Sequence, residues 1–296
     1  MKKEERKYIV YKNDLKFKDQ RNLNPQKIEW NNDNLESIYY NQNLDTIHYR
    51  LEECEKNNFD YLDLSHLYLK EIPLLSSKIT KPIKYLFLNN NNLSNLKNIE
   101  QFTNLQVLDI SNNSITTVDY LPKTINELCC KYNFIDKITS CRNLKILDCT
   151  NNKLVQLEEF MNLEILFCSE NNLNILPYYP KLKKLVCKNN NLREINSFTE
   201  LVYLDCSFNN ITQIRYCPKL KDLLCRDNKL TGIPNNMNSL KYIEMYNNKF
   251  TEIYYYPNLK ELYCDIDGIE KVPVEYKDKI LDTKVYRDKY LIIIFK

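Results

Sequence analysis

Three consecutive segments of the chain decide its fold: LEILFCSENNLNIL at residues 163–176, LKKLVCKNNNLREI at 182–195 and LVYLDCSFNNITQI at 201–214. Each segment begins 19 residues after the one before it, and all three share the pattern L-x-x-L-x-C-x-x-N-x-(L/I)-x-x-(L/I). An internal period of this length is typical of repeat proteins, in which each unit packs mainly against its neighbours. The sequence therefore predicts a solenoid.

The same pattern extends in both directions along the chain. Eleven units begin at Phe59, Ile83, Leu105, Ile125, Leu144, Leu163, Leu182, Leu201, Leu220, Leu240 and Leu259. We predict repeats over residues 59–277, a capping helix over 43–58 and a C-terminal cap over 278–296, while residues 1–42 are expected to be partly disordered. The apolar residues of the expected helix recur at helical spacing after Asn43, which we expect to cap its start: Leu44, Ile47, Leu51 and Cys54.

The repeat resembles the leucine-rich repeat family, whose consensus is L-x-x-L-x-L-x-x-(N/C)-x-L. The resemblance covers about residues 59–277, and the short unit is similar to the short-repeat class of bacterial effectors and of large DNA viruses of amoebae. It implies a curved right-handed β-solenoid, the α-β horseshoe, with a parallel sheet on the concave face. Only about twenty residues follow the repeats, so we do not expect the ligase domain that effectors of this class often carry.

The unit also predicts which side chains form the core. Strand side chains alternate, so positions four and six point inward, whereas positions three, five and seven point to the concave surface. Nineteen residues leave little room for a helix, and we expect extended or short 3-10 segments on the convex side. The residues at 290–295 predict a strand that covers the last repeat. A further apolar column closes the core from the convex side: Cys141, Phe160, Tyr179, Phe198, Cys217, Met237 and Tyr256.

Asparagine recurs at position nine. An amide both donates and accepts hydrogen bonds, so a buried column of amides can satisfy the backbone of the turns above and below. We predict a structural ladder made of Asn91, Asn113, Asn133, Asn152, Asn171, Asn190, Asn209, Asn228 and Asn248.

A cysteine column occupies position six: Cys130, Cys149, Cys168, Cys187, Cys206, Cys225 and Cys264. A metal site needs ligands that converge, and a disulfide needs Cβ atoms about 3.5–4.5 Å apart, whereas a straight ladder of parallel side chains offers neither. We therefore interpret the column as small core residues. Cys129 is expected to lie on the outward face instead.

Other features argue against catalysis. The two histidines, His48 and His66, stand in no recognisable catalytic motif, and two glycines could hardly build a phosphate-binding loop. The N-terminal MKKEERKYIV lacks the apolar part of a secretory signal, and no apolar run is long enough to span a bilayer. Eleven cysteines without such a signal indicate reduced thiols. We expect a cytoplasmic protein that is not an enzyme and has no cofactor, metal site or membrane contact.

The expected concave face carries more acidic than basic residues. The acids are Asp63, Asp109, Glu127, Asp148, Asp205, Asp222, Glu244, Glu261 and Asp265, and the bases are Lys131, Lys184, Lys188 and Arg226. A groove for nucleic acid should be basic, so this face and a net charge of only +3 argue against one.

Apolar and aromatic residues gather on the same face in the later units. Tyrosine and arginine are favoured interface anchors. We predict a partner-binding patch formed by Val186, Lys188, Tyr203, Leu224, Arg226, Tyr242, Tyr246 and Tyr263. The partner is expected to be a protein, and a host protein if the source is viral.

An enzyme that uses the floor of the concave face is one alternative to a binding module, and two others remain open. One is a structural scaffold that associates with itself, for example through the edge of the sheet. The other is binding of a polyanion through a rim of lysines at position two: Lys84, Lys145, Lys183, Lys221, Lys241 and Lys260. The rim can equally be a solvated edge, because lysines commonly occupy such positions.

Overall fold

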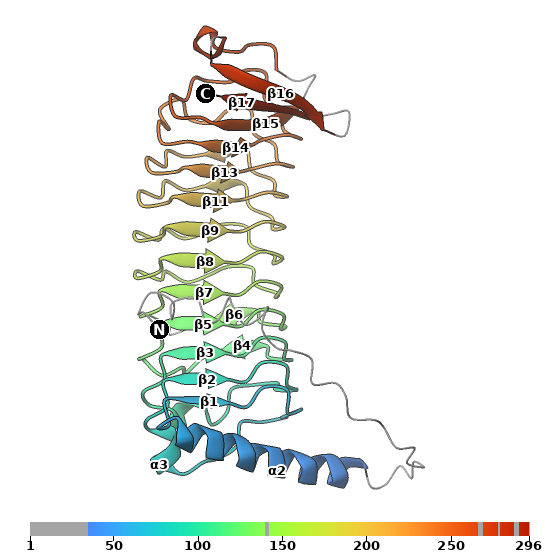
Figure 1. Cartoon of the computed structure of the whole chain (residues 1–296), viewed down its shortest axis with the longest axis vertical. Coiled ribbons are helices and arrows are strands. Elements are labelled where there is room, and N and C mark those ends of the chain that lie inside the picture. Colours follow the sequence, from blue (N-terminus) through green and yellow to red (C-terminus); the bar gives the residue numbers. More distant parts are fainter. Residues whose placement is uncertain (1–34, 140–141, 266–268, 278, 287–289, 296) are drawn as a thin grey trace.

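A computed structural model of the chain describes residues 35–139, 142–265, 269–277, 279–286 and 290–295. Short strands stack along the long axis of the molecule to form a solenoid (Figure 1). Helix α2 (Leu35–Lys56) lies at one end, and strands β16 (Ile280–Tyr286) and β17 (Tyr290–Phe295) lie at the other. In the part of the chain that the structure describes, no helix has the length and apolar character needed to cross a membrane.

Each predicted unit contributes one strand to a single sheet. These strands run parallel and in register, so that Leu185, Leu204 and Leu223 lie side by side. Every strand begins two residues after the predicted start of its unit, and the expected parallel-sheet solenoid is confirmed. The strands are β1 (Tyr61–Asp63), β2 (Tyr85–Phe87), β3 (Val107–Asp109), β5 (Glu127–Cys129), β7 (Ile146–Asp148), β8 (Ile165–Phe167), β9 (Lys184–Val186), β11 (Tyr203–Asp205), β13 (Asp222–Leu224), β14 (Tyr242–Glu244) and β15 (Glu261–Asp265).

The convex side is mostly extended, as the short unit predicts. Two small parallel sheets form there, from β4 (Thr117–Val118) with β6 (Lys137–Ile138) and from β10 (Glu194–Ile195) with β12 (Gln213–Ile214). Single turns of helix occur at α3 (Ser77–Thr80), η4 (Ile99–Gln101) and η5 (Val274–Tyr276).

The apolar column behind the sheet is buried wherever it is described. Phe160, Tyr179 and Phe198 stack with ring centroids 6.3 Å apart, and Cys217 and Met237 are fully buried. Cys141 lies outside the described residues. Positions four and six close the same core, because no unit alone could remove its apolar side chains from water.

The asparagine column forms a hydrogen-bonded ladder. The Asn190 side chain accepts from the backbone N–H of Leu173 at 2.9 Å and donates to the carbonyls of Cys168 and Cys187 at 2.9 and 3.1 Å. The other eight members make the same set of bonds. Each amide therefore bonds its own turn and the turn before it, and does not reach the turn after it as we had expected.

The residue before each ladder asparagine has a left-handed backbone. Its φ lies between 53° and 56° in all nine units, at Asn90, Asn112, Tyr132, Asn151, Glu170, Asn189, Phe208, Asp227 and Asn247. This conformation costs most side chains roughly 1–2 kcal/mol, and asparagine is among the residues that tolerate it best. In each recurring Asn-Asn pair, the first residue therefore turns the chain and the second forms hydrogen bonds with the backbone.

A second set of side chains ties neighbouring units together, and the sequence did not reveal it. It lies just before the first leucine of the unit. Asn143 donates to the carbonyl of Lys123 at 2.7 Å, and Asn258 donates to that of Asn238 at 2.8 Å. Asn104, Thr124, Asn162 and Ser239 make equivalent bonds. Because these residues differ in type, no single letter repeats at this position.

The N-terminal cap is longer than predicted. Helix α2 begins at Leu35, so the prediction that Asn43 starts it was wrong, and residues 35–42 belong to the helix. The rest of the segment expected to be disordered lies outside the described residues. Cys54 is buried against the first repeat, and Arg50 donates to the Asp63 carboxylate at 3.1 Å. The helix therefore closes the open end of the core.

The C-terminal cap contains the predicted strand. Strand β17 pairs antiparallel with β15, so that Ile293 lies opposite Leu262, and β16 pairs antiparallel with β17. Ile293 and Phe295 are buried against the last repeat.

The cysteine column belongs to the core, and the prediction that Cys129 is exposed was wrong. Cys129 is 4% exposed, between Asp109 and Asp148 on the neighbouring strands. Burial raises the pKa of the Cys168 and Cys187 thiols far above the ordinary value. Among the described residues, no three His, Cys, Asp or Glu side chains are grouped as a metal site would require.

Replacing one ladder amide should cost far more stability than replacing its neighbour. Asn190→Ala leaves the Leu173 N–H without its acceptor and removes one of the two amide donors from each of the Cys168 and Cys187 carbonyls, so we expect the free energy of unfolding to fall by about 1–3 kcal/mol in urea denaturation. The matched control is Asn191→Ala, at an exposed position, with an expected change within about 0.5 kcal/mol. Equal losses in the two variants would contradict the ladder.

The described thiols should be nearly inert in the folded protein. Burial raises the pKa of Cys54 to about 11 and that of Cys264 to about 12, and each unit lowers the thiolate fraction about tenfold. In a Cys141→Ser variant at about pH 8, a thiol-specific disulfide reagent should react at least ~100-fold more slowly than in guanidinium chloride. A fast phase in the folded variant would show that part of the column is accessible.

Candidate binding surface

The predicted patch lies on five neighbouring strands and the turns that follow them, at the C-terminal half of the concave face. Position three supplies a row of Lys184, Tyr203, Asp222, Tyr242 and Glu261 on β9, β11, β13, β14 and β15. Position five supplies Val186, Asp205, Leu224, Glu244 and Tyr263, in the same strand order. Lys188, Arg226 and Tyr246 follow two residues after their strands. All eight predicted residues are half-buried, and their role in binding stays a prediction.

Two tyrosines of the patch lie against each other. The rings of Tyr242 and Tyr263 are 5.3 Å apart between centroids and tilted by 42°. Each hydroxyl donates to a carboxylate of its own strand, Tyr242 to Glu244 and Tyr263 to Glu261, both at 3.3 Å. The rings therefore present apolar surface while their polar ends are held in fixed directions.

An arginine is held between two further rings. The Arg226 guanidinium lies 4.9 Å from the Phe208 ring centroid and 5.6 Å from that of Tyr246, and it pairs with Glu244 at 3.3 Å. It also donates to the Tyr246 hydroxyl. The Tyr246 ring lies 4.2 Å from that of Tyr290 in β17. Stacking and pairing restrict the arginine, so a partner would meet an ordered cation at a lower entropic cost.

Phe208 and Tyr290 were missed as members of this site. Phe208 occupies the left-handed turn position of its unit, where five of the nine residues are asparagine, so the repeat pattern gives no sign that its ring faces Arg226. Tyr290 comes from the C-terminal cap, and its place beside Asp265 follows only from the antiparallel pairing of β17 with β15.

A lysine bridges the aromatic residues of the adjoining strands. The Lys184 ammonium lies 5.2 Å from the Phe167 ring centroid and 5.1 Å from that of Tyr203. Burial, followed by the nearby Asp205 carboxylate, raises the pKa of Tyr203, and burial, followed by Glu244, raises that of Tyr242. These tyrosines therefore remain neutral hydrogen-bond donors at any physiological pH.

Four of the acids counted on this face have a structural role. Asp63 and Asp109 each accept from the backbone N–H two residues later, at 2.9 Å, and from the hydroxyl of the same serine at 2.6 Å. Asp148 and Asp205 accept the corresponding N–H at 3.1 and 3.2 Å. These carboxylates close the turn after the strand, in the manner of an Asx-turn.

The concave face is therefore less acidic than the number of its carboxylates suggests. Asp148 and Asp205 are buried, and burial raises the pKa of Asp109 and of Asp148. Asp63 is engaged by Arg50. The predicted patch carries charges of both signs, with Lys184 and Arg226 among Asp222, Glu244 and Glu261.

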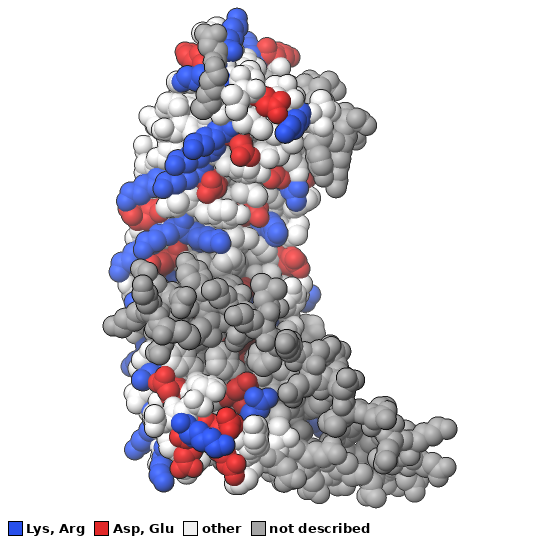
Figure 2. Space-filling model, viewed as in Figure 1, with Lys and Arg blue, Asp and Glu red and all other residues white. Residues whose placement is uncertain are grey.

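The lysine rim follows the edge at which the strands begin, where Figure 2 shows basic side chains with acidic ones between them. All six predicted rim lysines are exposed. Two of them pair with carboxylates, Lys84 with Asp60 at 2.9 Å and Lys183 with Glu164 at 2.7 Å. The rim is therefore a mixed edge and less basic than its lysines alone suggest.

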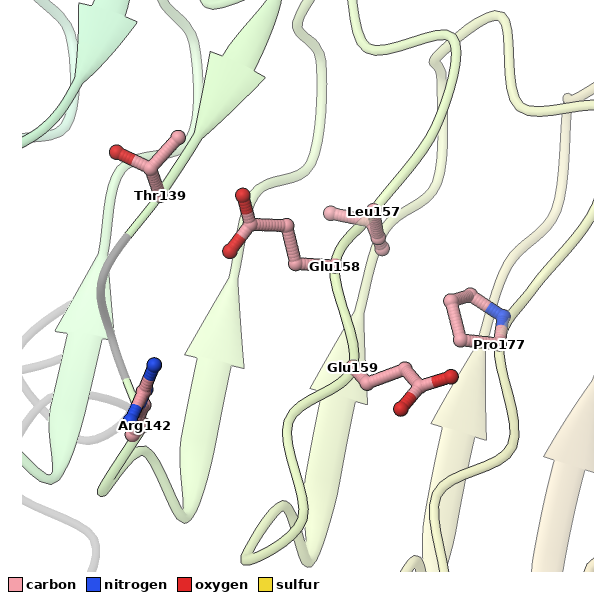
Figure 3. A pocket seen from close by; sticks show the side chains of 6 residues that line it. All are labelled: Thr139, Arg142, Leu157, Glu158, Glu159 and Pro177. Atoms are coloured by element: carbon pink, nitrogen blue, oxygen red, sulfur yellow. The ribbon is translucent and has the colours of Figure 1, made fainter.

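The described histidines and the convex surface offer no enclosed site. His48 faces Glu52 on α2, and His66 contacts the Asn90 amide at 3.2 Å. A cavity of about 570 Å³ opens on the convex side and is lined by Thr139, Arg142, Leu157, Glu158, Glu159 and Pro177 (Figure 3). Its charged side chains are exposed, and Glu158 and Glu159 point in different directions rather than toward one centre.

Several known structures share this fold. YopM from Yersinia enterocolitica WA-314 matches with a TM-score of 0.69 and 24% identity, over 78% of this chain and 52% of its own. The functional domain of InlJ from Listeria monocytogenes, which includes a cysteine ladder, matches with a TM-score of 0.55 and 26% identity, over 71% of this chain and 53% of its own. The leucine-rich repeat domain of APL1B matches with a TM-score of 0.52 and 16% identity, over 88% and 98%.

The chain spans about half the length of the YopM and InlJ chains that it matches. A family model described as leucine-rich repeats in two copies matches residues 83–123, the units that begin at Ile83 and Leu105. No curated protein matches the sequence. Because the same pattern recurs in every unit of the parallel sheet and the solenoid is shared with these structures, the chain has the leucine-rich-repeat fold.

Proposed function

We propose that this protein is a non-enzymatic interaction module that binds a protein partner on its concave face. The leucine-rich repeat fold is a typical scaffold for protein–protein interaction. The proposal that the partner binds on the concave face rests on the ordered aromatic and charged surface on β9 to β15. In this surface, Arg226 stacks between Phe208 and Tyr246, beside the Tyr242–Tyr263 pair. Aromatic residues and arginine are the side chains that most often dominate binding energy at interfaces.

The chemistry of this surface also suggests what kind of partner it fits. Its apolar area comes from rings held at their polar ends, while Lys184, Arg226, Glu244 and Glu261 supply both signs of charge within a few strands. A folded protein surface with an apolar centre and charges of both signs complements this pattern better than a uniformly charged polymer does. We further propose a cytoplasmic location. The resemblance to the short-repeat class of large DNA viruses extends this proposal to a partner from the host cell.

The proposal is tested by removing the rings while keeping the fold. The triple variant Tyr203→Ser, Tyr242→Ser, Tyr263→Ser changes half-buried side chains outside the core. A partner captured from a cytosolic extract by the wild type, and then purified, should bind the variant at least ~100-fold more weakly in calorimetry, because each lost anchor costs about 1 kcal/mol or more.

The matched control removes three exposed tyrosines from one column of the convex side, as Tyr120→Ser, Tyr178→Ser, Tyr216→Ser. It should bind the partner as tightly as the wild type does. Equal binding by the concave-face variant would refute the patch. A steep loss of affinity with salt, the same in both variants, would favour binding of a polyanion to the lysine rim instead.

A further inference from the structure

Different elements lie at the two ends of the main sheet. At the first end, helix α2 covers β1 and Arg50 pairs with Asp63. At the other end, the strand order finishes with β15, β17 and β16, and among the described strands β16 pairs with β17 alone. Strand β16 is therefore an edge strand, with backbone donors and acceptors along its outer side.

This edge strand is long and apolar for its position. It contains seven residues, whereas the strands β1 to β14 of the main sheet contain three each. Leu281 is 65% exposed, Val285 62% and Ile280 38%. Exposed edges of this kind favour pairing with another strand unless a bulge, a proline or charges prevent it. Strand β16 has an irregularity near its start and two charged side chains, but residues 282–286 pair regularly with β17 and the two charges are of opposite sign.

Two charged side chains of β16 favour one register of pairing with a second copy of the strand. Asp282 and Lys284 project from the same side of β16, and their charged groups lie 3.4 Å apart. If a second copy of β16 pairs antiparallel about a two-fold axis at Thr283, each Asp282 lies opposite the Lys284 of the other copy. Oppositely charged cross-strand neighbours stabilise such a pair.

The two neighbouring symmetric registers are disfavoured by the same residues. In a two-fold antiparallel pair, one residue must face its own copy. Centring the axis on Asp282 or on Lys284 places like charges directly opposite each other, which destabilises a sheet. The irregularity in β16 falls between Ile280 and Asp282, so both charged residues lie in the part of the strand that pairs regularly with β17.

We propose that two copies of this protein associate through β16, antiparallel and centred on Thr283, so that the two sheets become continuous. The two-fold axis is perpendicular to the sheet, and both concave faces therefore open to the same side. The dimer presents two binding surfaces to partners that are themselves multivalent, which raises the effective strength of binding without any new contact. This association is independent of the proposed concave-face function.

The self-association should depend on protein concentration. Pairing of one strand involves fewer residues than the roughly 20–30 per side of a stable interface, so the monomer and the dimer should exchange. Sedimentation velocity from about 5 to about 500 μM should show the mass rise from one copy towards two. A wild type that stays monomeric over this range would overturn the proposal.

A charge exchange tests the register itself. D282K places Lys opposite Lys284 of the other copy, and K284D places Asp opposite Asp282, so each variant alone should associate at least ~10-fold more weakly than the wild type. An equimolar mixture of the two variants again opposes unlike charges at both positions. We expect the mixture to form a heterodimer with an affinity close to that of the wild-type dimer.

The controls separate this effect from net charge and from folding. D136K and K153D make the same charge changes at exposed positions in the middle of the solenoid, and should dimerise like the wild type. Circular dichroism checks that each variant is folded. The concave-face tyrosine variant should dimerise normally. Dimers that tolerate both D282K and K284D, or a mixture no better than its components, would show that copies do not meet in this register.

Discussion

The hydrogen-bond requirement of buried turns is the constraint on which this structure depends. A 19-residue unit must leave the sheet, turn, cross the convex side and return, and its turn places peptide groups where water cannot reach them. The ladder of asparagines from Asn91 to Asn248 satisfies those groups unit after unit. Because each amide bonds its own turn and the one before it, the ladder also fixes how one unit sits on the next.

Because the units stack in register, residues at the same position of each repeat form rows along the surface. Residues at position three lie side by side along β9 to β15, as do those at position five. At strand spacing of about 4.8 Å, aromatic rings and long cations on neighbouring strands must contact each other. The Tyr242–Tyr263 pair and the Lys184 contact with Tyr203 arise in this way. The candidate binding surface is thus a direct consequence of the repeat.

Some carboxylates on the strands of the same sheet bond the backbone of the turns and are therefore not available on the concave surface. Asp63 and Asp109 close the turns after their strands, and Asp148 and Asp205 are buried in the same role. Counting outward positions in the sequence treats all such acids alike. The structure separates those that cap a turn from those, such as Glu244 and Glu261, that orient tyrosines on the open face.

The sequence by itself determined the period, the parallel sheet, the core columns and the asparagine ladder, because each depends on contacts that recur at the same spacing in unit after unit. It also determined that 290–295 form a strand over the last repeat. Only the tertiary structure decided that α2 begins at Leu35, that Cys129 is buried, and that Phe208 and Tyr290 join the site around Arg226 and Tyr246. These features depend on single, non-repeated contacts, often between residues distant in the chain, and a periodic pattern holds no information about contacts that occur once.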